Sequence, residues 1–136
     1  MSSSKVVLHW AGDGLVFRGG PVDGPEIVLD SDAREGPTPT QLLLLSLAGC
    51  MAVDVRMILE KSRVPVEALE VEVEGDRAAE VPRKFEALRL TYRVKGPTEG
   101  DQPKLQRAVD LSREKYCSVL HTLRPEINLD IRIEQA

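Results

Sequence analysis

The sequence is poor in metal-binding and disulfide-forming residues, with two cysteines and two histidines in 136 residues. Cys50 and Cys117 lie far apart, and His9 and His121 are the only imidazoles. Two cysteines without clustered histidine do not complete a zinc site, so we expect no metal and no cofactor. The chain also lacks a glycine-rich phosphate loop of the usual spacing, an internal repeat and a low-complexity tract. These absences leave the thiols as the candidate reactive groups.

Basic residues are also outnumbered by acidic ones, since 18 Lys and Arg against 22 Asp and Glu give a net charge of -4. The sequence has no basic stripe, which argues against nucleic acid as a partner. The first five residues are polar and begin no apolar signal region. We therefore expect a cytoplasmic protein without a membrane partner, built as a single domain over residues 1–136. In the cytosol paired cysteines are more often catalytic or redox-sensing than structural.

The longest apolar run, Leu42–Val53, lies in a predicted helix. Thr38 can cap its first free N–H groups, Pro39 suits the first helical position, and Gln41 can complete a capping box. Apolar side chains on all sides of a helix indicate burial. The run is shorter than the roughly 20 apolar residues that span a membrane. Since a chain this short can hardly cover such a helix alone, we expect a homodimer.

The rest of the chain shows strand and helix patterns in an α+β order. Alternating apolar residues predict strands, and the amphipathic stretch predicts a second helix. The expected strands are 5–10, 15–18, 26–30, 66–75, 85–94 and 128–134, and the expected helix is 103–115. Residues 116–123 either continue that helix or start a short new one. Lys84, Arg89 and Arg93 are predicted to face the glutamates of a neighbouring strand in an antiparallel sheet.

These elements, and two motifs within them, resemble the OsmC/Ohr family of osmotically inducible proteins C and organic hydroperoxide resistance proteins. The motifs are PTQLLLLSLAGCMAVDV at 39–55 and KYCSV at 115–119. The resemblance implies an OsmC-like fold with antiparallel sheets around a long buried central helix, in an intertwined homodimer. It also implies thiol-dependent reduction of a small-molecule organic peroxide, with an unidentified dithiol as reductant.

By position, the resemblance makes Cys50 the peroxidatic cysteine and Cys117 the resolving one. Arg18, at the end of the second predicted strand, stands where an active-site arginine is expected, and Gln41 could support it. Peroxidase members often carry a glutamate in the first helical turn. This chain has Thr40 and Gln41 there instead.

The residues themselves allow a reactive and a structural interpretation of each candidate. Cys50 lies well inside its helix, where burial disfavours the thiolate that attacks peroxides. A reactive Cys50 therefore needs a cation, and Arg18 beside glycines is the best candidate. The alternatives are core cysteines, a solvated Arg18 and a Gln41 that only caps. Asp54, one turn beyond Cys50, would disfavour the thiolate, and His121 could either pair with Cys117 or serve as a capping or surface residue.

Two functions follow from these alternatives. The first is a thiol peroxidase that forms a Cys50 sulfenic acid and then a Cys50–Cys117 disulfide. The second is a non-enzymatic dimer that binds a hydrophobic ligand or senses electrophiles or oxidants through Cys50. The cysteine pair favours the first function, and the missing glutamate favours the second.

Overall fold

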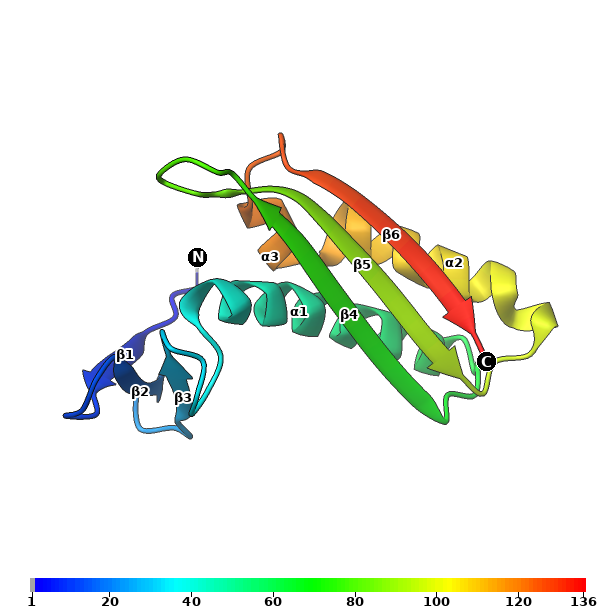
Figure 1. Ribbon diagram of the computed structural model, residues 1–136. Helices are drawn as coiled ribbons and strands as arrows, with labels where there is room; N and C mark the ends of the chain where they lie inside the picture. Colours follow the sequence, from blue (N-terminus) through cyan, green and yellow to red (C-terminus); the bar gives the residue numbers. More distant parts are fainter. Residues whose placement is uncertain (1) are drawn as a thin grey trace. The chain divides into compact units, whose positions relative to one another are not determined.

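A computed structural model describes residues 2–136 as a mixed α+β chain with two sheets and a long helix (Figure 1). The chain divides into two compact units at the Leu43–Leu44 bond. The predicted fold class is confirmed at this level. That residues 1–136 act as one domain stays a prediction.

The first unit contains a three-stranded antiparallel meander in the order β1-β2-β3. Its strands are β1 (Val6–Trp10), β2 (Val16–Pro21) and β3 (Ile27–Asp30). Strand β2 continues through Gly19 and Gly20, which the sequence suggested would turn. A Cβ on Gly19 would lie 2.7 Å from the Val7 carbonyl oxygen, so glycine permits this close pairing. Arg18 consequently lies in mid-strand, opposite His9 and Val28, and not at a strand end.

Helix α1 spans Pro39–Lys61 and begins with the predicted capping box. The Thr38 hydroxyl accepts the Gln41 N–H at 3.2 Å, and the Gln41 side-chain oxygen accepts the Thr38 N–H at 3.0 Å. Two of the orphan donors at the helix start are thereby satisfied.

The apolar surface of α1 is only partly covered within one chain. Its buried side chains recur at every fourth position or close to it, at Leu47, Ala48, Met51, Val55 and Leu59. Val53 and Met57 are 57% and 51% exposed. One chain therefore covers one side of the helix and leaves the other exposed, which agrees with the expectation that a chain this short can hardly cover the helix alone. By length and composition alone α1 could cross a membrane, but its inner face packs as a core helix.

The second unit has a three-stranded sheet in the order β4-β5-β6. Its strands are β4 (Ala68–Arg77), β5 (Phe85–Lys95) and β6 (Asn128–Gln135). Strands β4 and β5 are antiparallel as predicted, but β6 runs parallel to β5. The reason is the helical crossover between β5 and β6, which returns the chain to the end of the sheet where β5 starts.

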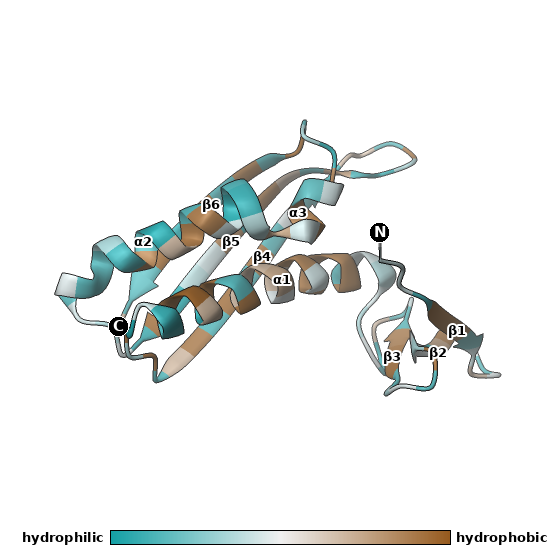
Figure 2. Cartoon of the chain, turned by 180° about the vertical axis from the view of Figure 1, so that it is seen from behind, coloured by the Kyte–Doolittle hydropathy of each residue, from teal (hydrophilic) through white to brown (hydrophobic). Residues whose placement is uncertain are grey.

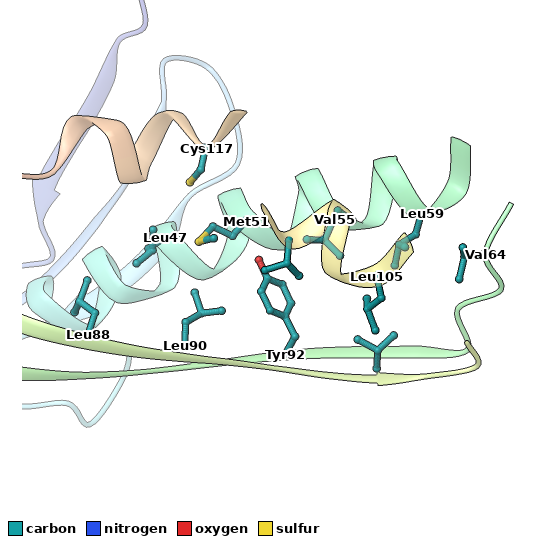
Figure 3. Close-up of a cluster of buried hydrophobic side chains, with 13 residues drawn as sticks. Leu47, Met51, Val55, Leu59, Val64, Leu88, Leu90, Tyr92, Leu105 and Cys117 are labelled. Carbon is teal, nitrogen blue, oxygen red and sulfur yellow. The ribbon is translucent and has the colours of Figure 1, made fainter. Parts of the chain in front are cut away.

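The two faces of β5 differ in the manner that its alternating sequence predicts. Figure 2 colours each residue of the chain by its hydropathy. Leu88, Leu90, Tyr92 and Val94 are buried and contribute to the core with α1 (Figure 3). The opposite face carries ion pairs between Arg89 and Glu74 (2.7 Å), Arg89 and Asp76 (2.8 Å), and Arg93 and Glu70 (2.8 Å). The predicted cross-strand pairing is confirmed for both arginines. Lys84 makes none of these ion pairs.

The crossover consists of a 3₁₀ turn and three helical segments. These are η1 (Glu99–Asp101), α2 (Gln102–Leu111), a π-helical turn (Ser112–Tyr116) and α3 (Ser118–Thr122). Cys117 leaves the helical conformation, with ψ at 100°, and caps α3. Residues after 117 therefore start a new short helix, which decides between the two predicted alternatives. The break places Cys117 at a joint between two helical segments.

Candidate functional site

The second unit brings Cys50 of α1 and Cys117 of the crossover together. Their Sγ atoms and a carboxylate oxygen of Asp54 all lie within 4.8 Å of one another. Both cysteines are free thiols. Cys50 and Asp54 share one side of α1 because they are four residues apart. Figure 3 shows Cys117 above α1, near Met51, on the side away from β5.

Cys117 is the more enclosed of the two thiols. Its side chain is fully buried, and its Sγ accepts the Leu120 N–H at 3.3 Å. Burial raises the pKa of the Cys117 thiol to about 11, and the neighbouring Cys50 and Asp54 act in the same direction. Cys117 is therefore a neutral thiol at physiological pH. Cys50 is half-buried and is the thiol more accessible to a solute.

Asp54 is the site residue whose importance sequence reasoning underestimated. The sequence placed Asp54 one turn beyond Cys50, as a charge that would disfavour the thiolate. In the structure its carboxylate lies beside both sulfurs and accepts a 2.8 Å hydrogen bond from the Ser112 hydroxyl. The spacing of four residues from Cys50 was the available signal. Ser112 is fully buried, and nothing in the sequence pattern distinguishes it.

Tyr92 adds a second polar group beneath the thiols. Its hydroxyl is buried and has no hydrogen-bond partner among residues 2–136. Burial raises the pKa of Tyr92 well above its usual range, and Cys117 and Asp54 add to that effect. In Figure 3 its oxygen points from β5 toward α1. The site therefore contains one buried hydroxyl that is available to hydrogen-bond a ligand.

His121 caps the crossover and does not face the thiols. Its Nδ1 lies 2.7 Å from the Cys117 carbonyl oxygen, and its Nε2 lies 3.1 Å from the Glu114 carbonyl oxygen. Of the two sequence interpretations, the capping role is confirmed. The ring stabilises the joint that carries Cys117.

Arg18 and Gln41 belong to the first unit. The Arg18 side chain is exposed in mid-strand, and Gln41 is engaged in the capping box. The structure brings together the two predicted cysteines, and the participation of Arg18 and Gln41 stays a prediction.

A cavity of about 520 Å³ opens beside Asp54. Apolar side chains form much of its wall, and two cations stand on its rim. Its lining includes Met57, Ile58, Leu111, Tyr116, Lys61 and Arg107. A solute in this cavity would meet the Asp54 side of the thiol site.

Comparison with known proteins defines the class to which this fold and thiol pair belong. The family model described as OsmC-like protein matches residues 31–132. The chain is 38% identical over 123 residues to protein YhfA of Escherichia coli K12, covering 90% of each. The chain belongs to the OsmC-like family.

Solved structures agree with this assignment. A hypothetical protein from Aquifex aeolicus VF5 has a TM-score of 0.86 and 33% identity, covering 100% of this chain and 98% of its own. An organic hydroperoxide resistance protein OsmC from Legionella pneumophila has a TM-score of 0.68 and 15% identity, with 98% of each chain covered. The second likeness shows a shared fold.

Proposed function

We propose that the protein is a cytoplasmic thiol peroxidase that reduces organic hydroperoxides. The observation that carries this proposal is the placement of two free thiols with their sulfurs within 4.8 Å. A disulfide requires a sulfur separation of about 2.05 Å, which side-chain rotation at two such neighbours can supply. Further support is the family, which includes structures titled organic hydroperoxide resistance proteins.

The difference in burial supports the proposed roles of the two cysteines. Cys50 is accessible, so its thiolate attacks the distal peroxide oxygen, breaking the O–O bond and giving a Cys50 sulfenic acid and an alkoxide. The alkoxide takes a proton to leave as an alcohol. The neutral Cys117 thiol, held beside it, then condenses with the sulfenic acid to form the disulfide and water. A dithiol reductant returns both thiols, and its own sulfurs become a disulfide.

A homodimer accompanies this proposal. In the first unit, Val16 is the sole buried apolar side chain among residues 2–43, while Val6 and Trp10 are 72% and 61% exposed. The exposed side of α1 adds Val53 and Met57. Large exposed apolar side chains, when they gather in a patch, mark interfaces. A second copy of the chain would cover both surfaces and contribute its own thiol pair.

A second candidate function is non-enzymatic sensing or binding of a hydrophobic molecule through Cys50. The observation that favours it is the Asp54 carboxylate, which lies within 4.8 Å of both sulfurs. A negative charge there opposes thiolate formation. The apolar cavity beside Asp54 suits a hydrophobic ligand.

Single-turnover peroxide consumption separates the two functions. Reduced protein is mixed with excess tert-butyl hydroperoxide in a chelator-containing buffer, with wild type, Cys50→Ser and Cys117→Ser compared. We expect wild type to lose two hydrogens by mass spectrometry within one chain. Cys117→Ser should consume peroxide and accumulate oxidised Cys50, and Cys50→Ser should consume none. Equal consumption by both variants would refute the assigned roles, and no consumption by wild type would favour the sensing function.

A further inference from the structure

The thiol site has the donor set of a metal site as well as that of a redox pair. Two Sγ atoms and one carboxylate oxygen converge within 4.8 Å. Bonds of about 2.3 Å to sulfur and about 2.0–2.2 Å to oxygen place tetrahedral zinc ligands roughly 3–4 Å apart. Small side-chain rotations therefore bring these three atoms to zinc-binding positions.

The carboxylate of the thiol site has no ion-pair partner among the described residues. Asp54 forms no ion pair with any Lys, Arg or His among residues 2–136, and its one hydrogen-bond donor is the neutral Ser112. Ionised thiols would add further negative charge in a partly enclosed space. A divalent cation would compensate this charge.

The Tyr92 hydroxyl is a second, independent observation. Tyr92 has 0% exposure, and its hydroxyl makes no hydrogen bond of ordinary geometry among the described residues, although Ser112, Cys117 and Asp54 are close enough to affect it. Buried hydroxyls are normally hydrogen-bonded. A metal-bound thiolate, or a water on the metal, would accept this proton and satisfy the group.

We propose that Cys50, Cys117 and Asp54 bind one Zn²⁺ through two thiolates and one carboxylate, with the fourth position open to solvent. Three protein ligands and one open position are typical of catalytic zinc sites, whereas structural sites have four protein ligands. The sequence argued against zinc because only cysteine and histidine were counted as ligands. The structure adds a carboxylate from the next turn of α1.

Zinc binding and oxidation of the two thiols exclude each other at this site. Zinc binding is thus a second property of the site, beyond the proposed peroxidase activity. Zn²⁺ replaces the protons of two thiols, so one ion bound releases two protons and leaves a complex of net charge -1. A Cys50–Cys117 disulfide has no thiolate to offer and cannot hold the ion. Bound zinc therefore protects Cys50 from peroxide, and oxidation of the pair by peroxide releases the ion.

Titration of reduced, metal-free protein with Co²⁺ and then Zn²⁺ tests the proposal. Co²⁺ reports tetrahedral thiolate ligation through its visible and charge-transfer absorption, and Zn²⁺ should displace it. We expect one ion per chain and two protons released per ion. Asp54→Asn should weaken binding by about tenfold or more, and either Cys→Ser variant should lose the thiolate band. Asp110→Asn, an exposed α2 carboxylate paired with Gln106, is the matched control and should bind normally.

Wild type oxidised with diamide, in which mass spectrometry confirms the Cys50–Cys117 disulfide, is the unmutated control and should bind no metal. Unchanged binding by Asp54→Asn or by the oxidised protein would overturn the proposal, as would the absence of a one-to-one complex. Peroxide consumption in chelator is independent of these outcomes, so failure of the metal site and failure of the peroxidase are distinguishable.

Discussion

The Ser112 hydroxyl donates a 2.8 Å hydrogen bond to the Asp54 carboxylate and so joins the π-helical turn before Cys117 to the helix that carries Cys50. We predict that Ser112→Ala lowers the free energy of unfolding by about 1.5–3 kcal/mol, because a charged acceptor loses its donor. Urea denaturation measures this change. Ser118→Ala, at an exposed position of α3, should stay within about 0.5 kcal/mol of wild type. An equal effect of both substitutions would contradict a specific role for the bond.

Because the pKa of Cys117 is raised in the folded protein, the free energy of unfolding should vary with pH in the alkaline range. Its folded-state pKa of about 11 lies above the free value of 9.0. Burial of the neutral thiol therefore contributes its full stability below pH 9, and this contribution is lost as the pH rises toward 11. We predict that wild type loses up to about 2–3 kcal/mol across this window from Cys117 alone. Cys117→Ala should lose correspondingly less, measured by urea denaturation at each pH. Identical pH slopes would show that Cys117 does not titrate in this window.

The sequence predicted those features of the fold that depend on residues close together in the chain. The Thr38–Gln41 capping box and the inward alternation of β5 both formed as expected. The parallel pairing of β6 was not predictable from its own alternation, since both pairings share a period of two. It depends on how the helical crossover returns the chain, which is a property of tertiary packing.

In the thiol site too, some residues were predicted from the sequence and others were found only in the structure. A resemblance across the chain identified Cys50 and Cys117, and the structure brings their sulfurs together. The link from Ser112 to Asp54 joins residues 58 positions apart and carries no motif. The sequence did not say which side of α1 is covered within one chain, because apolar residues lie on all sides of the helix.

A substitution on the exposed side of α1 tests the proposed dimer. Within one chain the Val53 side chain is 57% exposed, so Val53→Glu alone should cost little stability in a monomer. In a dimer that covers this side of α1, the buried charge would be unpaired and would drive dissociation. We predict a wild-type dimer and a Val53→Glu monomer by sedimentation at low micromolar concentration. Lys104→Glu, exposed on α2, should remain dimeric. A monomeric wild type that is folded and stable would contradict the proposal.

The last prediction concerns the cation that a mid-helix thiol requires. Arg18 lies in mid-strand in β2, and its side chain is exposed. If Arg18 supplies the charge, Arg18→Ala should shift Cys50 alkylation to higher pH, because an opposite charge within ~4–6 Å favours the ionised thiol. The rate of the first peroxide step should fall while the free energy of unfolding stays unchanged.

The measurement is the pH profile of iodoacetamide alkylation in a Cys117→Ser background, where Cys50 is the one remaining thiol. Arg18→Lys keeps the charge but loses the planar fork of donors, so it should restore part of the profile. Lys5→Ala removes an exposed cation just before β1 and should leave the profile unchanged. A profile that responds equally to Lys5→Ala and Arg18→Ala would reflect net charge alone. A profile that responds to neither would remove Arg18 from the site and leave Cys50 to react without a cation from this strand.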